Sequence, residues 1–99
     1  MKIVMALAVT MSSAAVVAND QLAQKYACTG CHQMERKVVG PPWKGIRDKY
    51  KDGSVTAAQL AKVIKAGSTG KWGPIPMPPQ ASVTDADAEA LAGWILRAK

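Results

Sequence analysis

The feature of this 99-residue chain that most restricts its fold is the segment Cys28-Thr29-Gly30-Cys31-His32. A Cys-x-x-Cys-His sequence is the attachment pattern of a c-type haem. The two thiols can add to the vinyl groups of the porphyrin and form thioethers, and the imidazole that follows is held beneath the iron as an axial ligand. The sequence holds two cysteines and one histidine, all of them in this segment. We therefore predict one haem c, covalently bound through Cys28 and Cys31, with His32 on the iron.

Two other uses of the Cys-x-x-Cys pair have to be weighed against haem attachment. A tetrahedral zinc site needs four donors, whereas this segment supplies three and the chain has no second cluster of cysteine or histidine. A dithiol redox pair that opens a helix would have a thiol with a lowered pKa, but that activity normally accompanies a βαβ pattern, which is absent here. Haem attachment is favoured, and the dithiol pair is the stronger alternative.

The second axial position of a haem iron decides what the iron can do. Apart from three methionines in the first eleven residues, the chain offers Met34 and Met77. Met34 follows His32 too closely to reach the opposite face of a porphyrin, which leaves Met77 as the sixth ligand. Met77 lies in the segment 71–79, whose four prolines predict a stiff, extended loop. The alternative, that Met77 fills a gap in the core, suits such a loop less well.

The first 18 residues have the pattern of a secretory signal peptide. Lys2 gives a positive start, residues 3–9 are apolar, and Val16-Val17-Ala18 is a small-residue exit. We predict cleavage after Ala18, with Ala15 as the second choice. An uncleaved membrane anchor is the alternative, but the apolar stretch is short for a bilayer span of about 20 residues. The mature domain, residues 19–99, would then lie in a bacterial periplasm without stable membrane insertion.

The mature chain would be one small domain, whose core supplies only a few kcal/mol without a further cross-link or cofactor. The sequence has no phenylalanine, three tryptophans and two tyrosines, so it contains few large apolar side chains. We therefore expect the porphyrin to be the centre of the core, the apoprotein to be largely unfolded, and the holoprotein to be a monomer.

Helical periodicity surrounds the haem motif and the proline-rich loop. A first helix is predicted to begin at Asn19 or Asp20 and to run into the haem motif. Gly40-Pro41-Pro42 turns the chain, and a short second helix follows and ends near Gly53. The apolar positions of these two helices are Leu22, Ala23, Tyr26, Trp43, Ile46 and Tyr50.

Capping patterns mark the starts of two more helices. Thr56 with Gln59 forms a capping box, and Gly67 is a suitable stop for that third helix. The last helix begins at Thr84, with acidic residues at 85, 87 and 89 that complement the helix dipole. The apolar positions are Leu60, Val63, Ile64, Ala88, Leu91, Ala92 and Ile95. Because no window alternates clearly between apolar and polar residues, the predicted fold class is all-α.

Four segments in order, 28–32, 39–41, 67–68 and 72–79, resemble those of small bacterial class I cytochromes c of the c-551 (c8) type. The resemblance extends over residues 19–99. It implies the class I cytochrome c fold, with about four short helices around one haem, and a mono-haem electron carrier. It further implies a thioether at each cysteine, axial ligation by His32 and Met77, a hydrogen bond from the imidazole to the Pro41 carbonyl, and one from Trp72 to a haem propionate.

The chain departs from the family pattern at three positions. Val63 stands where relatives can have an arginine that pairs with a propionate. Trp43 replaces a common tyrosine, and Gln80 replaces a frequent asparagine after the ligand loop. These changes can alter the propionate environment, the potential and the geometry at Met77. For Trp43 and Trp94 we favour simple packing in the core.

A six-coordinate iron has no open position, so dioxygen and peroxide could bind only if Met77 left. Methionine ligation and burial both favour the ferrous state. The acidic residues at 85, 87 and 89 look like a helix cap, and no residue group indicates acid–base or nucleophilic catalysis. We therefore predict an electron carrier of a respiratory chain and not an enzyme.

Within the family, such carriers often feed a nitrite reductase, a cytochrome oxidase or a peroxidase. A haem enzyme or gas sensor would need a labile Met77.

The charge of the chain indicates the chemistry of its partners. The chain has thirteen lysines and arginines and seven acidic residues, and removal of the leader would leave twelve basic residues against seven. Two haem propionates would subtract about two positive charges, and the domain would stay cationic. Seven basic residues gather in the middle of the chain: Lys44, Arg47, Lys49, Lys51, Lys62, Lys65 and Lys71. Most are expected to be solvated surface, and a few to steer transient docking of acidic redox proteins. Nucleic acid is not expected as a partner, because the chain lacks a base-reading motif.

Overall fold

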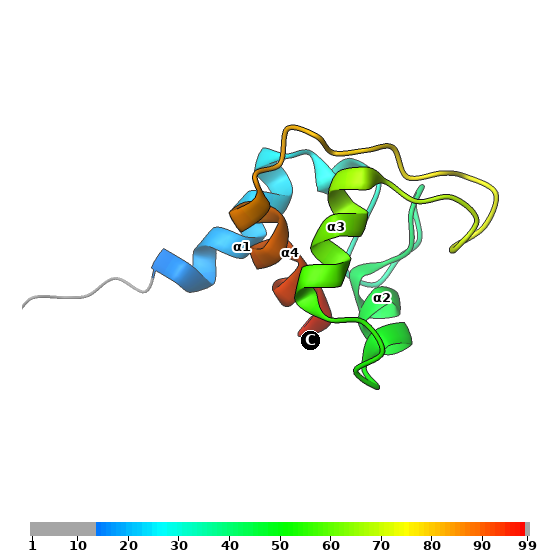
Figure 1. Cartoon of the computed structure of the whole chain (residues 1–99), viewed down its shortest axis with the longest axis horizontal. Helices are drawn as coiled ribbons and strands as arrows, with labels where there is room; N and C mark the ends of the chain where they lie inside the picture. Colours follow the sequence, from blue (N-terminus) through cyan, green and yellow to red (C-terminus); the bar gives the residue numbers. More distant parts are fainter. Residues whose placement is uncertain (1–13, 99) are drawn as a thin grey trace, which may run out of the picture.

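The computed structural model describes residues 14–98, and these form four α-helices and one short 3₁₀ turn (Figure 1). The elements are α1 (Ala14–Lys25), η1 (Cys28–Gly30), α2 (Trp43–Tyr50), α3 (Ala57–Ala66) and α4 (Asp85–Leu96). No β-strand occurs within this range, where pairing is limited to two isolated bridges. The predicted all-α class is confirmed. Residues 1–13, which carry most of the predicted signal peptide, lie outside the described residues.

Helix α1 begins earlier than the sequence analysis predicted. It starts at Ala14 and continues through Asn19 and Asp20, which were expected to cap its first turn. Residues 14–18 read Ala-Ala-Val-Val-Ala, with no glycine or proline to interrupt the helix, and alanine is the best helix former. In the uncleaved chain the helix therefore extends upstream of Asn19. No helix in the range 14–98 is long and apolar enough to cross a bilayer.

The predicted caps of the third and fourth helices are confirmed. The Thr56 hydroxyl accepts a hydrogen bond from the Gln59 backbone N–H at 3.2 Å, and the Gln59 side chain accepts one from the Thr56 N–H at 2.9 Å. Thr84 accepts from the Asp87 N–H at 3.1 Å and starts α4. Each cap satisfies donors that a helix start leaves unpaired. Helix α3 ends at Gly67, as predicted.

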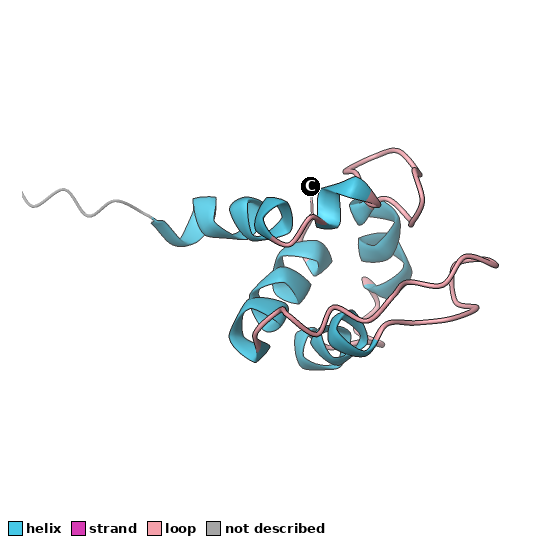
Figure 2. Ribbon diagram, turned by 90° about the horizontal axis from the view of Figure 1, so that it is seen from above, coloured by secondary structure: helices cyan, strands magenta, loops and turns pink. Residues whose placement is uncertain are grey.

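Helix α4 is the centre of the packing, because it contacts α1, α2 and α3 (Figures 1 and 2). The buried face of α4 consists of small and aliphatic residues, and Trp43 is the one aromatic side chain among the buried residues of the described core. The buried apolar residues are Ala23, Trp43, Ile46, Leu60, Ala61, Ile64, Val83, Ala88, Leu91, Ala92, Ile95 and Ala98. One polar contact also joins the residue just after α1 to α4: the Tyr26 hydroxyl donates to an Asp87 carboxylate oxygen at 2.6 Å.

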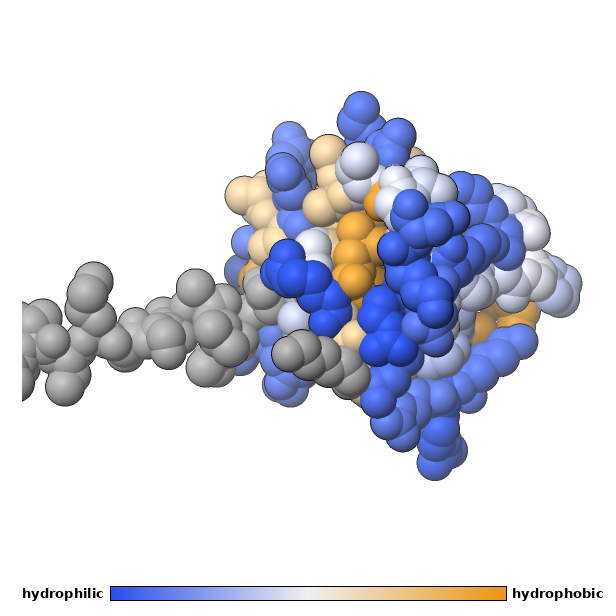
Figure 3. Space-filling view, turned by 90° about the horizontal axis from the view of Figure 1, so that it is seen from below, coloured by the Kyte–Doolittle hydropathy of each residue, from blue (hydrophilic) through white to orange (hydrophobic). Residues whose placement is uncertain are grey.

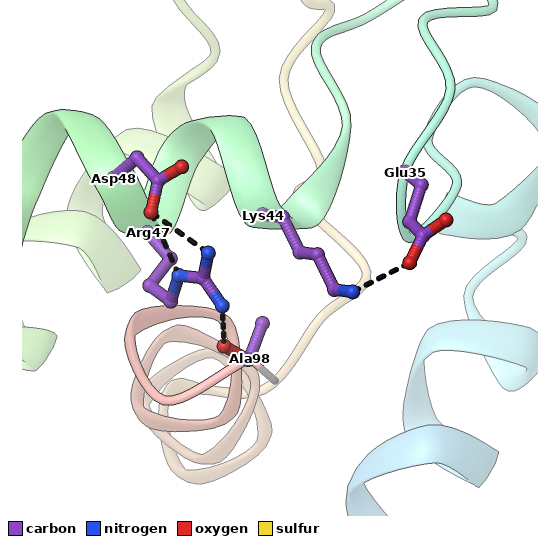
Figure 4. A network of polar contacts seen from close by, with 5 residues as sticks. All are labelled: Glu35, Lys44, Arg47, Asp48 and Ala98. Carbon is purple, nitrogen blue, oxygen red and sulfur yellow. Dashed lines mark hydrogen bonds and ion pairs between the residues drawn. The ribbon is translucent and has the colours of Figure 1, made fainter.

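A polar network holds α2 between the segment after the haem motif and the C-terminal end of α4 (Figure 4). The Lys44 ammonium lies 2.6 Å from a carboxylate oxygen of Glu35. The Arg47 guanidinium contacts the Asp48 carboxylate at 2.8 Å and also donates to the carbonyl oxygen of Ala98. A cation at the end of α4 is favourable, because the carbonyls there carry partial negative charge. The contacts of Lys44 and Arg47 thus link α2 to Glu35 and to the C-terminal end of the chain after α4.

The surface of the domain is largely hydrophilic. Figure 3 shows one face on which hydrophilic side chains border a small apolar area. The large apolar side chains that are most exposed are Val38, Val39 and Ile75, and Ile75 is 60% exposed. Val39 and Ile75 also line a cavity between the helices, so they mark where it meets solvent.

Candidate haem-binding site

A cavity of about 340 Å³ opens between α2, α3, α4 and two loops, and it contains all six predicted site residues. This volume is within the range of small-molecule and cofactor sites. Side chains of α2, α3 and α4 form much of the wall, and most of them are apolar. The predicted site residues that line the cavity are Cys28, Cys31, His32, Pro41, Trp72 and Met77.

The haem motif forms one tight turn at the edge of this cavity. The N–H groups of Cys31 and His32 both donate to the carbonyl oxygen of Cys28, at 3.1 and 2.9 Å. The turn follows Ala27, which has a left-handed backbone with φ of 58°. This sharp change of direction separates the motif from α1 and directs both cysteines and the histidine to the cavity.

The His32 imidazole is buried and held by the segment that follows it. Its Nδ1 lies 2.7 Å from the carbonyl oxygen of Pro41, which is the contact that the family resemblance implied. With Nδ1–H donating to that carbonyl, Nε2 carries the lone pair that a metal needs. Gly40 lies against the same ring, because a Cβ there would come within 2.4 Å of His32 Cε1. Only glycine leaves room for the imidazole.

Trp43 contacts this imidazole directly, which the sequence analysis did not foresee. The two ring centroids are 4.5 Å apart and the ring planes differ by 24°, which is a stacked arrangement. Trp43 is 5% exposed, as expected for a core residue. Its place after Gly40-Pro41-Pro42 is visible in the sequence, but stacking depends on the tertiary turn that brings residue 43 back to residue 32. No sequence signal specifies it.

Met77 is placed by backbone contacts at the base of the proline-rich loop. Ser68 and Met77 exchange two hydrogen bonds: Ser68 N–H donates to Met77 O at 3.1 Å, and Met77 N–H donates to Ser68 O at 2.8 Å. Gly67 has φ of +78°, and a Cβ there would lie 2.5 Å from the Met77 carbonyl oxygen. The glycine that ends α3 thus also permits the close approach of the loop that carries Met77.

Gln80 ties the far end of the same loop to α3. Its backbone N–H donates to the carbonyl oxygens of Ile64 and Lys65, at 3.3 and 3.1 Å. Its side-chain amide donates to the carbonyl oxygen of Pro78 at 3.0 Å. The loop therefore returns to the end of α3 at both of its ends, which restricts the position of Met77.

Trp72 lies in this loop and lines the cavity. It meets Tyr50 edge to face, with centroids 6.4 Å apart, and the Lys49 ammonium lies 4.4 Å from the centre of its ring. Both partners belong to the last turn of α2, so these contacts attach the loop to that helix. Val63, in place of a possible arginine, also lines the cavity and offers no charge there.

The two thiols differ in exposure. Cys31 is exposed and Cys28 is partly buried. Burial raises the pKa of the Cys28 thiol above its ordinary value, and the neighbouring Cys31 adds to the rise. The raised pKa reduces the thiolate fraction at neutral pH. A reactive dithiol at the start of a helix would instead have a thiol with a lowered pKa.

The sequence and the fold both match known proteins. Residues 14–95 match the family described as cytochrome C oxidase, cbb3-type, subunit III. The chain is 56% identical over 82 residues to cytochrome c-552 of Nitrosomonas europaea, covering 83% of this chain and 80% of that one. It is 45% identical over 75 residues to cytochrome c-551 of Allochromatium vinosum, covering 76% and 80%. This chain belongs to the cytochrome c family, in its c-551/c-552 type.

A solved structure agrees with this assignment. The crystal structure of wild-type Nitrosomonas europaea cytochrome c552 matches the fold with a TM-score of 0.77 and 56% identity, over 81% of this chain and 99% of that one. The class I cytochrome c fold is therefore confirmed. As a cytochrome c, this chain carries covalently attached haem c. Its cavity fits the group, because a largely apolar hollow presents two thiols and a buried imidazole together.

More of the basic residues of this cytochrome make contacts within the protein than the sequence analysis assumed. Three of the seven form ion pairs: Lys44 with Glu35, Arg47 with Asp48, and Lys65 with Asp85. Lys49 lies over Trp72. Within residues 14–98, Lys51, Lys62 and Lys71 have no carboxylate partner, and Lys71 lines the cavity.

Proposed function

We propose that this cytochrome is a one-electron carrier whose haem iron is held by His32 and Met77. The observation that carries the proposal is the cavity, which brings the two thiols, the buried imidazole and the methionine loop to one place. The haem supplies a ferrous/ferric couple when bound. Cys28 and Cys31 anchor it, Pro41 orients the imidazole, and Trp72 donates to a propionate.

Ligation by Met77 is what makes the protein a carrier and not an enzyme. A thioether binds iron weakly, so its loop must be ordered before binding if the bond is to persist. The hydrogen bonds to Ser68, the close approach at Gly67 and the attachment of Gln80 to α3 all support such ordering. If His32 and Met77 both held the iron, small ligands would be excluded, and the chain would only accept and release an electron.

The dithiol oxidoreductase alternative loses support from the cysteine environment. The raised pKa of the Cys28 thiol opposes thiolate formation. The motif also lies on a three-residue turn and not at the start of a helix.

We further propose that the partners are acidic redox proteins that dock transiently. The cationic balance of the chain favours them, and Lys51, Lys62 and Lys71, which pair with no carboxylate within residues 14–98, are the mid-chain basic residues that we propose to steer the encounter. Exposed Val39 and Ile75 at the edge of the cavity supply apolar contact area where an electron would leave. Such interfaces are small and salt-sensitive.

We place this transfer in the periplasm, after removal of residues 1–18 as a signal peptide. Cleavage after Ala18 would remove the first five residues of α1 and leave Asn19 at the start of the mature chain. N-terminal sequencing of protein exported by a bacterial host would identify the site, and an intact residue 1 would contradict cleavage.

Carbon monoxide binding to the reduced holoprotein tests the carrier function. The wild-type protein should exchange one electron with a soluble mediator and bind no carbon monoxide at neutral pH. Met77→Ala should open the iron and bind it readily, whereas the matched variant Met34→Ala should behave as the wild type. Ready binding by the wild type would instead indicate a sensor or an enzyme, and protein without thioether-bound haem would revive the dithiol alternative.

A further inference from the structure

Three neighbouring residues hold the His32 ring, one through a hydrogen bond and two through direct contact with the ring. The Pro41 carbonyl determines the direction of Nδ1, and Gly40 lies against the ring edge at Cε1. Trp43 adds a stacked indole at 4.5 Å. Gly40, Pro41 and Trp43 come from one four-residue segment, which we call the imidazole clamp. All three parts act on the side chain that is proposed to ligate iron.

The backbone keeps this segment in register with the haem motif. The N–H of Gly40 donates to Cys31 O at 2.8 Å, and the N–H of Trp43 donates to Gln33 O at 2.8 Å. These two bonds bracket His32 in the sequence. The stack between residues 32 and 43 therefore follows from a fixed turn and does not depend on one flexible side chain finding another.

A second indole packs against the Trp43 side chain. Trp94 of α4 meets Trp43 at an angle of 63°, with ring centroids 5.5 Å apart. Edge-to-face contacts of this kind stabilise beyond the area that they bury. Trp43 also sits at the first position of α2, after Pro42, and the contacts of Lys44 and Arg47 hold that helix (Figure 4).

A hydrogen bond and a stacked ring restrict different motions. The Pro41 carbonyl sets the tautomer and the direction of Nδ1, but it leaves the imidazole free to rock about the line between the two atoms. A nearly parallel indole opposes that rocking. From this geometry we infer that Trp43 is a positioning residue that fixes the plane of the His32 imidazole, beyond its place in the core. The inference rests on the proposed ligation of iron by His32.

Fixing the plane has two consequences for electron transfer. The hydrogen bond to Pro41 raises the donor strength of the imidazole, and it stays short only while the ring keeps its orientation. A ring that has the same orientation in both oxidation states also needs no rearrangement when the electron moves, which is the benefit of a preorganised site. Trp43 should therefore influence both the potential and the electronic asymmetry at the iron.

The test compares three variants of the holoprotein. Trp43→Leu removes the stack and keeps an apolar side chain, Trp43→Phe keeps an aromatic plane, and Trp94→Leu removes an indole that touches Trp43 but is not stacked on His32. Two quantities are measured: the proton shifts of the haem ring methyls in the ferric protein, which depend on the axial ligand planes, and the one-electron equilibrium with a mediator. Free energies of unfolding are recorded alongside.

Trp43→Leu should change the pattern of the methyl shifts and move the equilibrium toward the ferrous state by about tenfold, as for loss of a group that orients a ligand. For a one-electron couple that is about 59 mV. Trp43→Phe should restore most of both. Trp94→Leu should lower stability and produce only a small part of either change, because the backbone bond from Trp43 N–H to Gln33 O keeps the indole beside His32. If the Trp43→Leu protein accumulates poorly, Trp43→Ile replaces it, because isoleucine also cannot stack on the imidazole.

Three results would overturn the inference. If Trp43→Leu lowers only the stability, or if Trp94→Leu produces the same shifts, Trp43 is a packing residue. A move toward the ferric state would mean that the indole acts by excluding water and not by orienting the ring. Failure of the proposed function is recognised separately, because the wild-type spectrum itself would then lack histidine–methionine ligation.

Discussion

Ala27 is the residue at which α1 turns into the haem motif, and its backbone is left-handed with φ of 58°. For a residue with a Cβ this conformation costs about 1–2 kcal/mol. Ala27→Gly should therefore stabilise the holoprotein by about 0.5–1 kcal/mol, after allowing for the greater freedom of glycine in the unfolded chain. Guanidinium unfolding measures the change. Ala23→Gly, inside α1, should destabilise instead, and a loss of stability in Ala27→Gly would show that the turn is not strained.

Gly67 is the residue at which the end of α3 and the ligand loop come closest. Its conformation, φ 78° and ψ 177°, is one that glycine adopts almost alone. A Cβ would also meet backbone atoms of Met77, Pro78 and Pro79 within 3.0 Å. Gly67→Ala should lower stability by about 1–3 kcal/mol and weaken the far-red absorption band of methionine–ferric ligation, because the loop must move away.

Gly70 offers a matched control for that experiment. It also has positive φ, of 80°, but a Cβ there would meet nothing within 4 Å. Gly70→Ala should introduce backbone strain and leave the ligation band intact. Equal loss of the band in both variants would mean that strain, and not the contact with Met77, holds the loop.

At the residue scale, sequence patterns pointed to one place in the structure where the chemistry is local, while the roles of these residues at the iron stay predictions. Cys-x-x-Cys-His and the methionine loop are contiguous patterns, and the cavity contains every residue that they singled out. The stack of Trp43 on His32 and the cation of Lys49 over Trp72 join residues that are distant in sequence. Such contacts depend on how the helices pack, so no spacing rule could have predicted them.

At the scale of helices, α3 and α4 are joined by an ion pair as well as by their apolar faces. Lys65 near the end of α3 contacts Asp85 at the start of α4, and this hydrogen bond and charge lower the pKa of the Asp85 carboxyl. Because the pKa is lower in the folded state, the pair stabilises the fold above the unfolded-state pKa of Asp85. That stability is lost as the pH falls through the lowered value.

Asp85→Asn should therefore flatten the acid side of the stability profile, with little change in its shape at neutral pH. The measurement is the denaturant midpoint of wild type and variant as the pH is lowered. Lys65→Met keeps the carboxylate at the helix start and removes its partner, so it separates the ion pair from the helix dipole. Two parallel profiles would exclude any contribution from the titration of Asp85.

Helix limits were predictable where a cap defines them. Thr56, Gln59 and Gly67 bound α3, and Thr84 starts α4, because each satisfies backbone groups in a local and recognisable way. The start of α1 was misplaced, since Asn19 and Asp20 can cap a helix but do not stop one that already runs from Ala14. A capping residue permits a boundary and does not impose it.

For the whole molecule, the combination of a small core and an open cavity leads us to expect that the fold depends on haem. The cavity of about 340 Å³ meets solvent at Val39 and Ile75, so without haem its largely apolar wall would stay in contact with water and would add little to stability. The sequence pointed to this dependence through its lack of phenylalanine, whereas the size of the cavity required the structure.

The double variant Cys28→Ser/Cys31→Ser, which cannot form thioethers, should accordingly lose most of its helical circular dichroism at 25 °C. Met77→Ala, which keeps both thioethers, should remain helical and serves as the control. A cooperative thermal transition from a native-like helical state in the double variant, without haem, would contradict this dependence.

Met77, and no other methionine, is the residue that we propose completes the coordination of the iron. Its most direct test is the proton–carbon NMR spectrum of the ferrous protein with methionine methyl groups labelled with ¹³C. One methyl signal should be shifted far upfield by the ring current of the haem, should vanish in Met77→Leu, and should persist in Met34→Leu. If the wild-type protein shows no upfield methyl signal, or if the signal vanishes in Met34→Leu and persists in Met77→Leu, Met77 is not the ligand.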